Sequence, residues 1–258
     1  MSPARVAGAL LGALLVLFII GPLLRLLWEA PPSALMAAAA DREVRDAITL
    51  TVLAASAATA LALVLGVPLG YALARTRFPG SRLLRGVLDL PVVIPHPVAG
   101  LALLLFLGRQ SAIGGALGQV GLEIVSHVPG IVAAMLFVSA PLLVSGAREA
   151  FAAVDPKLER VARTLGDTGW TAFRRVTLPL AGRGILAGAL LAWGRSVSEF
   201  GAIVILAYHP KVASILIFDR FTLYGLPAAV PVAGLLLLVA LGVFLALRWL
   251  EPRRDEGR

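Results

Sequence analysis

The chain has 258 residues, of which 59% are hydrophobic and 15% are charged, and its mean hydropathy is +0.91. A soluble domain usually carries about 25% charged residues, so this composition excludes an ordinary water-soluble fold and indicates an integral membrane protein. The sequence contains no cysteine, which excludes disulfide bonds and thiol chemistry.

Six apolar segments are long enough to cross a bilayer, because about 20 helical residues cover the ~30 Å of hydrocarbon. Such segments must be helices, since lipid offers no partner for backbone N–H and C=O groups. We therefore predict an all-α, polytopic membrane protein that forms a single domain over residues 1–258. The predicted spans are residues 6–27, 48–74, 88–108, 127–147, 184–207 and 226–250.

The net charge of +8 is concentrated in alternate connections between these spans. Residues 75–85, 148–183 and 248–258 are rich in arginine, whereas the connections at 29–47 and 109–126 are acidic or carry little charge. This alternation is the positive-inside pattern, and it predicts that both termini are cytoplasmic. The basic excess is then topological and contacts anionic membrane lipid, and we expect no nucleic-acid partner.

The first apolar run follows Arg5 and continues to Leu27, which is longer than the apolar region of a secretory signal peptide. We expect a retained span. The alternative is a signal peptide cleaved near residues 37–40, which leaves five spans and the same cytoplasmic C-terminus.

The third span begins with three prolines, Pro91, Pro95 and Pro97, each of which removes a backbone donor. We expect this end to be kinked or unwound where protein or a water-filled cavity covers it. His96 lies between two of the prolines, either as a packed hydrogen-bond partner or as a contact in a transport pathway. No second histidine or carboxylate stands at ligand spacing, so we predict no metal site.

Arg195 and Glu199 lie deep in the fifth predicted span, where a charge costs about 2.5–3.5 kcal/mol to insert. Their i,i+4 spacing predicts an ion pair on one helix face. The pair is either a structural lock between helices or part of a gate or pathway that also includes Ser196 and Ser198. Both interpretations remain open at this point.

Residues 149–179 form a charged, amphipathic loop between two apolar spans. Asp155 and Pro156 predict a helix start, and Gly166 suits the left-handed position that follows a helix. Asp167 or Thr168 can cap a second short helix, which we expect to end at Leu178-Pro179. The apolar residues of the two helices recur at helical spacing and are Leu158, Val161, Ala162, Leu165, Trp170, Phe173 and Val176.

The same loop carries the spacing A-x3-G-x9-[IV]-x-L-P at Ala162, Gly166, Val176, Leu178 and Pro179. The chain resembles the type I ABC-importer permeases, in which this loop is the coupling region that docks with the ATP-binding subunit. The resemblance implies a coupling loop at about 149–180. Its candidate contact residues are Asp155, Glu159, Arg160, Ala162, Gly166, Trp170, Phe173, Leu178 and Pro179.

One departure concerns Arg160 and Val161, which stand where the family has Glu and Ala. Glu159, one residue earlier, can supply the charge. The alternative for the whole loop is a surface hairpin that only packs against its own bundle or against lipid.

The segments RSVSEFGA and LPVVIPHPVAG resemble the molybdate/tungstate branch of the sulfate-related oxyanion permeases. The resemblance implies a homodimer that works with two ATP-binding cassette subunits and an extracytoplasmic oxyanion-binding protein. A sulfate or thiosulfate permease of the same family is the alternative.

The sequence contains no G-x4-G-K-[ST] loop, so we expect ATP and magnesium to be used by the partner ATPase, with no cofactor and no catalytic residue in this chain. An ATP-independent transporter or channel is an alternative of another class, and it would show inverted repeats with paired broken helices. An intramembrane enzyme would need a nucleophile and base, or a metal set, that three scattered histidines do not supply.

Overall fold

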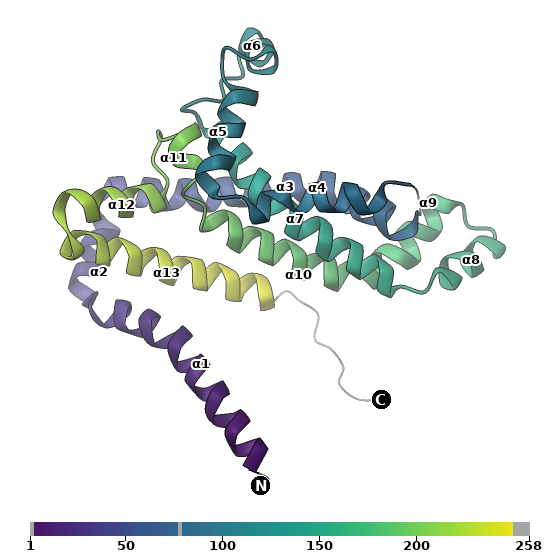
Figure 1. The fold of residues 1–258 in the computed structure, drawn as a ribbon, viewed down its shortest axis with the longest axis horizontal. Coiled ribbons are helices and arrows are strands. Elements are labelled where there is room, and N and C mark those ends of the chain that lie inside the picture. Colours follow the sequence, from purple (N-terminus) through teal and green to yellow (C-terminus); the bar gives the residue numbers. More distant parts are fainter. Residues whose placement is uncertain (1–2, 77–78, 250–258) are drawn as a thin grey trace.

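The computed structural model describes residues 3–76 and 79–249, and over those residues it consists of helices joined by short connections (Figure 1). The predicted all-α fold is confirmed. The basic tail at residues 253–258 lies outside the described residues. The helices are α1 (Pro3–Trp28), α2 (Pro32–Ala40), α3 (Arg42–Arg75), α4 (Ser81–Val93), α5 (His96–Leu107), α6 (Ala112–Gln119), α7 (Val128–Ala153), α8 (Pro156–Thr164), α9 (Gly169–Ala172), the π-helical turn η1 (Phe173–Thr177), α10 (Leu178–Val197), α11 (Ile203–Leu206), α12 (Ala213–Tyr224) and α13 (Leu226–Trp249).

Five helical runs in the described part of the chain are long and apolar enough to span a membrane. They are residues 7–28 of α1, then α3, α7, the run 169–197 and α13. A sixth span exists only if α4 and α5, which are bent by 112° relative to each other, count as one. The expectation of six spans is met in this form, with one of them broken.

The third predicted span, residues 88–108, is therefore not one helix. The helix α4 begins earlier, at Ser81, so that the basic residues Arg82 and Arg85 lie within it. The break falls at Ile94-Pro95, where both residues have extended backbone, and Pro97 occupies the first turn of α5. Because prolines cannot donate to the helical ladder, the chain changes direction here, as the sequence indicated.

The fifth predicted span, residues 184–207, is wrong at both ends. The helical run begins at Gly169 and ends at Val197, after which the chain turns before the short helix α11. The apolar sequence that continues to residue 207 is buried in the protein rather than extended along a helix, and Ala202, Ile203 and Leu206 are each at most 1% exposed. Hydropathy alone cannot distinguish a segment that is buried in the protein from a helix that spans the membrane.

Small residues allow α3, α7 and α10 to lie close together in the core. A Cβ atom at Gly184 would lie 2.6 Å from the Cβ of Ala150, and one at Gly70 would lie 2.9 Å from the Cβ of Ala147. Gly70 of α3 and Gly184 of α10 therefore allow close helix packing.

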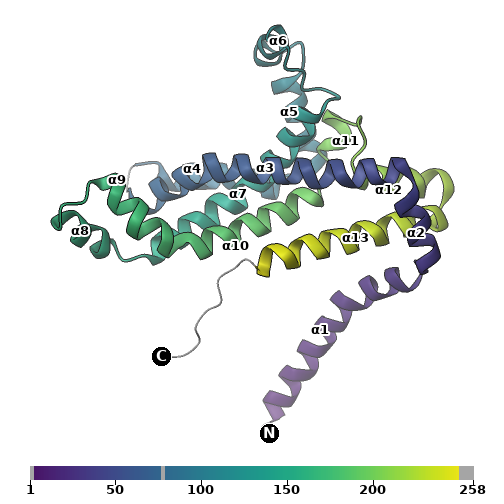
Figure 2. The same cartoon turned by 180° about the vertical axis from the view of Figure 1, so that it is seen from behind.

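Different helices lie at the two ends of the bundle (Figures 1 and 2). The helices α8 and α9 extend beyond one end, and α2 and α12 cover the other. The N-terminal end of α1 and the C-terminal end of α13 both point away from the α2–α12 end. The cytoplasmic location of the two termini stays a prediction. The helices α5 and α6 project sideways from the bundle, and α1 diverges from it.

The close packing of α7 and α10 predicts opposite effects for two glycines of α10. Gly184→Ala creates a 2.6 Å clash with Ala150 and should lower stability by about 1–3 kcal/mol. Gly182→Ala meets nothing within 4 Å, so the better helix propensity of alanine should leave stability unchanged or raise it by up to about 1 kcal/mol. Thermal unfolding of both variants in the same detergent tests this. Equal melting temperatures for the two would contradict the packing of the core.

Candidate functional site: coupling loop and intramembrane cluster

The loop after α7 contains a helix with well-defined ends. The carboxylate of Asp155 accepts the backbone N–H of Lys157 at 2.8 Å, which caps α8 in the predicted way. Gly166 follows the helix with φ of +104°. The N–H of Asp167 donates to the carbonyl of Ala162 at 3.1 Å, and the N–H of Gly166 donates to Arg163 at 3.2 Å. This is a Schellman motif, so Gly166 turns the chain sharply.

The second half of the loop differs from the prediction. Thr168 caps α9 by accepting the N–H of Thr171 at 3.2 Å, as expected. The helix does not end at Leu178-Pro179, however, but continues through η1 into α10. In η1 the N–H of Leu178 bonds to the carbonyl of Phe173, five residues back. A π-turn shifts the hydrogen-bond ladder and accommodates the proline in the first turn of α10, so the loop and the fifth span form one helical run.

Side chains from three elements hold the loop to the bundle. The carboxylate of Glu159 accepts the hydroxyl of Tyr71 at 2.9 Å and that of Thr177 at 3.0 Å. Arg75 donates to the carbonyl of Val154 at 3.0 Å. Glu159 therefore faces α3 and η1, while Arg160 is exposed. The sequence reasoning missed Tyr71, Thr177 and Arg75; a tyrosine at the basic end of an apolar span was a signal that pointed to the first of them.

Aromatic rings fill the space beside this carboxylate. The ring centroids of Tyr71 and Phe173 lie 4.8 Å apart, and those of Tyr71 and Phe151 lie 5.2 Å apart, both in edge-on geometry. Trp170 stacks on Phe173 at 5.6 Å and remains 68% exposed. Such edge-on and stacked pairs stabilise by about 0.5–1.5 kcal/mol each beyond the area they bury, so the second half of the loop is firmly attached to α3 and α7.

The outer face of α8 carries exposed apolar residues that no described residue covers. Val161 is 56% exposed and Leu165 is 83% exposed, although both belong to the stripe predicted from helical spacing. Ala162 is half-buried, and Leu178 and Pro179 lie within or next to the membrane run. Val161 and Leu165 are therefore not covered by the bundle, and the alternative in which the loop packs only against its own bundle or against lipid stays open for lipid.

Arg195, His96 and Glu199 meet where α10 ends and α5 begins. The guanidinium Nη2 of Arg195 lies 2.6 Å from Oε2 of Glu199 and 2.7 Å from Nε2 of His96. Arg195 Nη1 also donates to the hydroxyl of Ser198 at 3.1 Å. The other ring nitrogen of His96, Nδ1, also lies 3.1 Å from Nη2 of Arg195.

The predicted ion pair thus forms, but not on one helix face. Glu199 lies beyond the end of α10, where its second oxygen accepts the N–H of Ala202 at 2.7 Å and its carbonyl accepts the hydroxyl of Ser214 at 2.8 Å. Ser196 does not join the cluster: its buried hydroxyl has no hydrogen-bond partner among the described residues. The cluster links α10, α5 and the turn before α11.

Exposure within the cluster is uneven. The side chain of Glu199 is 0% exposed, whereas those of Arg195 and His96 are 23% and 40% exposed. A group that approaches from the open side meets hydrogen-bond donors and the positive guanidinium while the carboxylate is sealed behind them. This arrangement can contact an anion weakly without leaving the buried carboxylate unpaired.

A second charged network, which the sequence reasoning did not single out, lies at the α2–α12 end. Asp219 of α12 bonds to Lys211 at 2.8 Å and to the hydroxyl of Tyr208 at 2.7 Å, and Arg220 bonds to Asp41 at 2.6 Å. Burial raises the pKa of Asp219, but hydrogen bonds from Lys211 and Tyr208 outweigh it and hold that pKa below its usual value. The hydrogen bond from Arg220 lowers the pKa of Asp41.

The fold and the loop together define a helical membrane permease with an exposed amphipathic helix, α8, between two spans. A family model described as "Binding-protein-dependent transport system inner membrane component" matches residues 66–256, and the chain belongs to this family. The match covers the loop at 149–180, the cluster around Arg195 and the helices α11, α12 and α13 that follow the cluster.

Curated relatives and solved structures agree with this membership. The chain is 46% identical over 215 residues to the molybdate/tungstate transport system permease protein WtpB of Thermococcus kodakarensis, which covers 83% of this chain and 82% of that relative. It is 34% identical over 215 residues to the sulfate transport system permease protein CysT of Salmonella typhimurium, covering 82% and 78%. The structure of a bacterial ABC transporter that imports alginate matches with a TM-score of 0.70 at 19% identity over 98% of this chain and 96% of that one, and it shows the shared fold.

The network at the α2–α12 end predicts a pH dependence. Asp41 and Asp219 have lowered pKa values in the folded state, so their contribution is fully present above the unfolded pKa near 3.8 and is lost as the pH falls through the folded values. The melting temperature should therefore be flat from neutral pH to about pH 5 and fall below about pH 4. Asp219→Asn should remove part of this fall and cost about 1–3 kcal/mol at pH 7. If Asp219→Asn were as stable at pH 7 as the original chain, this prediction would be wrong.

Proposed function

We propose that this chain is the membrane-spanning permease subunit of an ATP-driven importer that moves molybdate or tungstate across the cytoplasmic membrane. Similarity to permeases of that name, at 46% and 43% identity, supports the substrate. One structural observation carries the mechanism: the exposed docking helix α8 leads into a single helical run, residues 169–197, that ends beside Arg195, His96 and Glu199.

The partners follow from the family and from the surface of the loop. We propose a homodimer of this chain, two ATP-binding cassette subunits on the cytoplasmic side, and an extracytoplasmic binding protein that delivers the oxyanion. A solved alginate importer of the same fold is in complex with a substrate-bound periplasmic protein, which supports this arrangement. ATP and magnesium are used by the ATPase subunits, and this chain binds no cofactor.

The ATPase drives the transporter through α8. Closure of the two ATPase subunits on ATP moves the docked α8 helices, and Glu159 together with the aromatic rings around Tyr71 passes that movement to α3 and η1. Since 169–197 is one helical run, its far end moves with the loop. The bundle then changes from inward-facing to outward-facing and accepts the anion from the binding protein.

Arg195, His96 and Ser198 make the weak contacts to the passing anion. The side chains of Arg195 and His96 are partly exposed, Ser198 is exposed, and the buried Glu199 keeps the resting site neutral. A neutral resting cluster suits a pathway, because a strong anion site inside the membrane would slow release. The ion pair of Arg195 and Glu199 thus has a structural role and a pathway role at the same time.

The docking role of α8 predicts a large effect of a charge at Leu165. Leu165→Asp should weaken association with the ATPase subunits by about 2 kcal/mol, roughly 30-fold, because the side chain loses apolar contact in the interface. Leu165→Met keeps that contact and serves as the matched control. Co-purification and ATP hydrolysis of the complete transporter measure both. Full association of Leu165→Asp would show that α8 does not dock.

The pathway role predicts a specific loss when the cluster is removed as a neutral unit. The double variant Arg195→Gln, Glu199→Gln leaves no unpaired charge and keeps an amide oxygen that can accept the N–H of Ala202, so assembly should be normal. Anion uptake should fall by about 10–100-fold, as expected for the loss of one charged hydrogen bond in the rate-limiting passage.

Molybdate uptake into vesicles that contain the complete transporter and its binding protein measures this effect. Ser139→Ala serves as the control for a substitution within a span. The buried hydroxyl of Ser139 has no hydrogen-bond partner among the described residues, so this variant breaks no described hydrogen bond. Normal uptake by the double variant would leave the pair with a structural role alone.

Sulfate is the second candidate substrate, because sulfate permeases match at 33–34% identity. The lower identity favours molybdate or tungstate. Competition during uptake distinguishes the candidates: unlabelled tungstate should suppress molybdate uptake at concentrations at which sulfate has no effect.

A further inference from the structure

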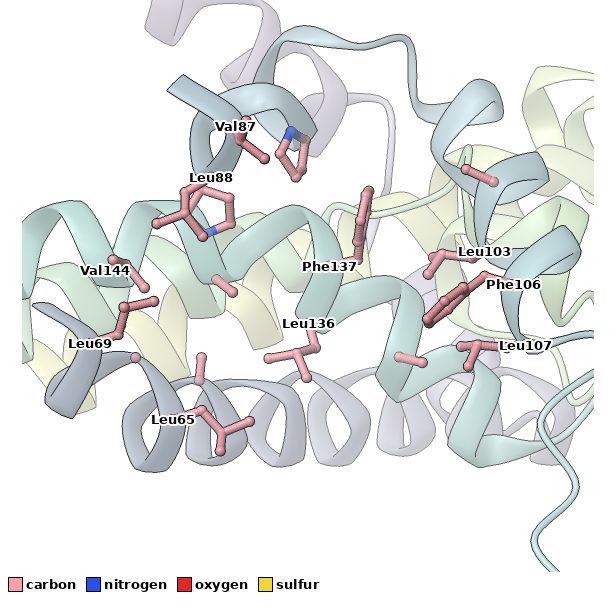
Figure 3. A pocket seen from close by; sticks show the side chains of 17 residues that line it. Leu65, Leu69, Val87, Leu88, Leu103, Phe106, Leu107, Leu136, Phe137 and Val144 are labelled. Carbon is pink, nitrogen blue, oxygen red and sulfur yellow. The ribbon is translucent and has the colours of Figure 1, made fainter. Parts of the chain in front are cut away.

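An apolar groove lies on the side of the bundle where α4 and α5 diverge (Figure 3). Its volume is about 720 Å³, and its walls come from α3, α4, α5 and α7. Leu65 and Leu69 line it from α3, and Phe106 lines it from α5. All the side chains that line it are apolar, and no described residue closes the groove, so it suits a flexible hydrocarbon.

Leu69 and Val144 mark the end of the groove that is nearer the coupling loop, and from there the groove extends along α7 to Ala133. Leu65 and Leu69 precede the end of α3 at Arg75 by ten and six residues, which places them about 9–15 Å from that end. Val144 precedes the end of α7 by nine residues, about 13 Å. These depths correspond to the acyl chains of the cytoplasmic leaflet, just below the headgroups.

A small polar pocket adjoins the groove on the side of the headgroups. It shares Leu88, Pro141 and Val144 with the groove, and it is also lined by Arg85 and Arg148. One carboxylate, that of the exposed residue Asp89, lines it as well, so two guanidinium groups face one negative charge. The volume of the pocket is only about 40 Å³, so a headgroup can contact its mouth but cannot be enclosed by it.

The two arginines have little competition from the protein. Arg85 uses Nε to donate to the carbonyl of Ser81, at 3.0 Å, in its own helix. Arg148 lies 3.4 Å from Glu149, an adjacent residue whose side chain is 73% exposed. Such a long, exposed pair contributes little, so both guanidinium groups retain donors for an external phosphate.

We propose that this groove and the adjoining arginine pocket bind one anionic phospholipid of the cytoplasmic leaflet. The phosphate contacts Arg85 and Arg148, and an acyl chain fills the groove down to the level of Leu65. A basic pocket between spanning helices on the cytoplasmic side is the arrangement that recognises such headgroups. The acyl chain then separates α4 from α5 and supports the 112° bend between them.

The experiment uses the complete transporter, purified in mild detergent from vesicles that contain phosphatidylglycerol or phosphatidylcholine. Retained lipid is counted by native mass spectrometry. The original chain should retain phosphatidylglycerol in preference to phosphatidylcholine. Arg85→Gln and Arg148→Gln should each lower this retention roughly 5-fold, and the double variant about 25-fold. Arg82→Gln, at an exposed residue of the same helix outside the pocket, should retain lipid as the original does.

A second pair of variants tests the groove itself. Ala140→Trp places a large ring into the groove and should abolish retention, whereas Leu53→Trp, at a position of α3 that is 62% exposed and outside the groove, should not. Unchanged retention in Ala140→Trp and in the double arginine variant would overturn the proposal.

A second copy of the chain is the competing occupant of the groove. Since the chain has no cysteine, Leu69→Cys and Phe106→Cys can be introduced as single thiols. Efficient crosslinking of these thiols between two copies, with no retained phospholipid, would overturn the proposal in favour of that occupant.

Discussion

The continuity of the helical run from Gly169 to Val197 is the constraint on which the proposed mechanism depends. Its 29 residues extend about 43 Å, so it connects the docking loop with the cluster around Arg195 without a flexible joint. The only irregularity is the π-turn at η1, which lies where Thr177 bonds to Glu159. A displacement of the loop therefore becomes a displacement of the whole helix, because the close packing of α7 and α10 leaves little room for local adjustment.

Two carboxylates anchor the two ends of this run, and neither can be exchanged for an apolar residue without a loss. Glu159 accepts hydroxyl groups from α3 and η1, and Glu199 accepts a backbone N–H and a guanidinium. In both places a buried acceptor is satisfied by groups from different elements, which fixes the relative position of those elements. The charge of Arg195 can be present inside the membrane only because Glu199 lies beside it.

Local signals were sufficient to predict much of the loop. Asp155, Gly166 and Thr168 each act within a few residues of themselves, so the start of α8, its end and the start of α9 could be predicted. The proline-rich break between α4 and α5 follows from the same kind of reasoning.

The missed side-chain contacts of the loop and the cluster join distant residues. Tyr71 and Glu159 are 88 positions apart, and His96 and Arg195 are 99 apart, so spacing rules could not pair them. The spacing rule for Arg195 and Glu199 predicted the correct pair, but it assumed a helix that continues past Glu199, whereas α10 ends at Val197. The π-turn was missed because proline at residue 179 normally marks a helix boundary, and only its place in the first turn of α10 allows the run to continue.

Because Glu159 points toward the bundle, its charge is not available on the face of α8 that would meet the proposed ATPase partner. With that carboxylate occupied by Tyr71 and Thr177, the outer face of α8 presents exposed arginine at residues 160 and 163 beside the apolar residues Val161 and Leu165. A cleft that receives this face must combine apolar walls with acidic groups, because two guanidinium groups buried against a basic or neutral surface would remain unpaired. In family members with Glu in place of Arg160 the charge at this position has the opposite sign. The ATPase of this transporter should therefore discriminate between the two kinds of loop by charge.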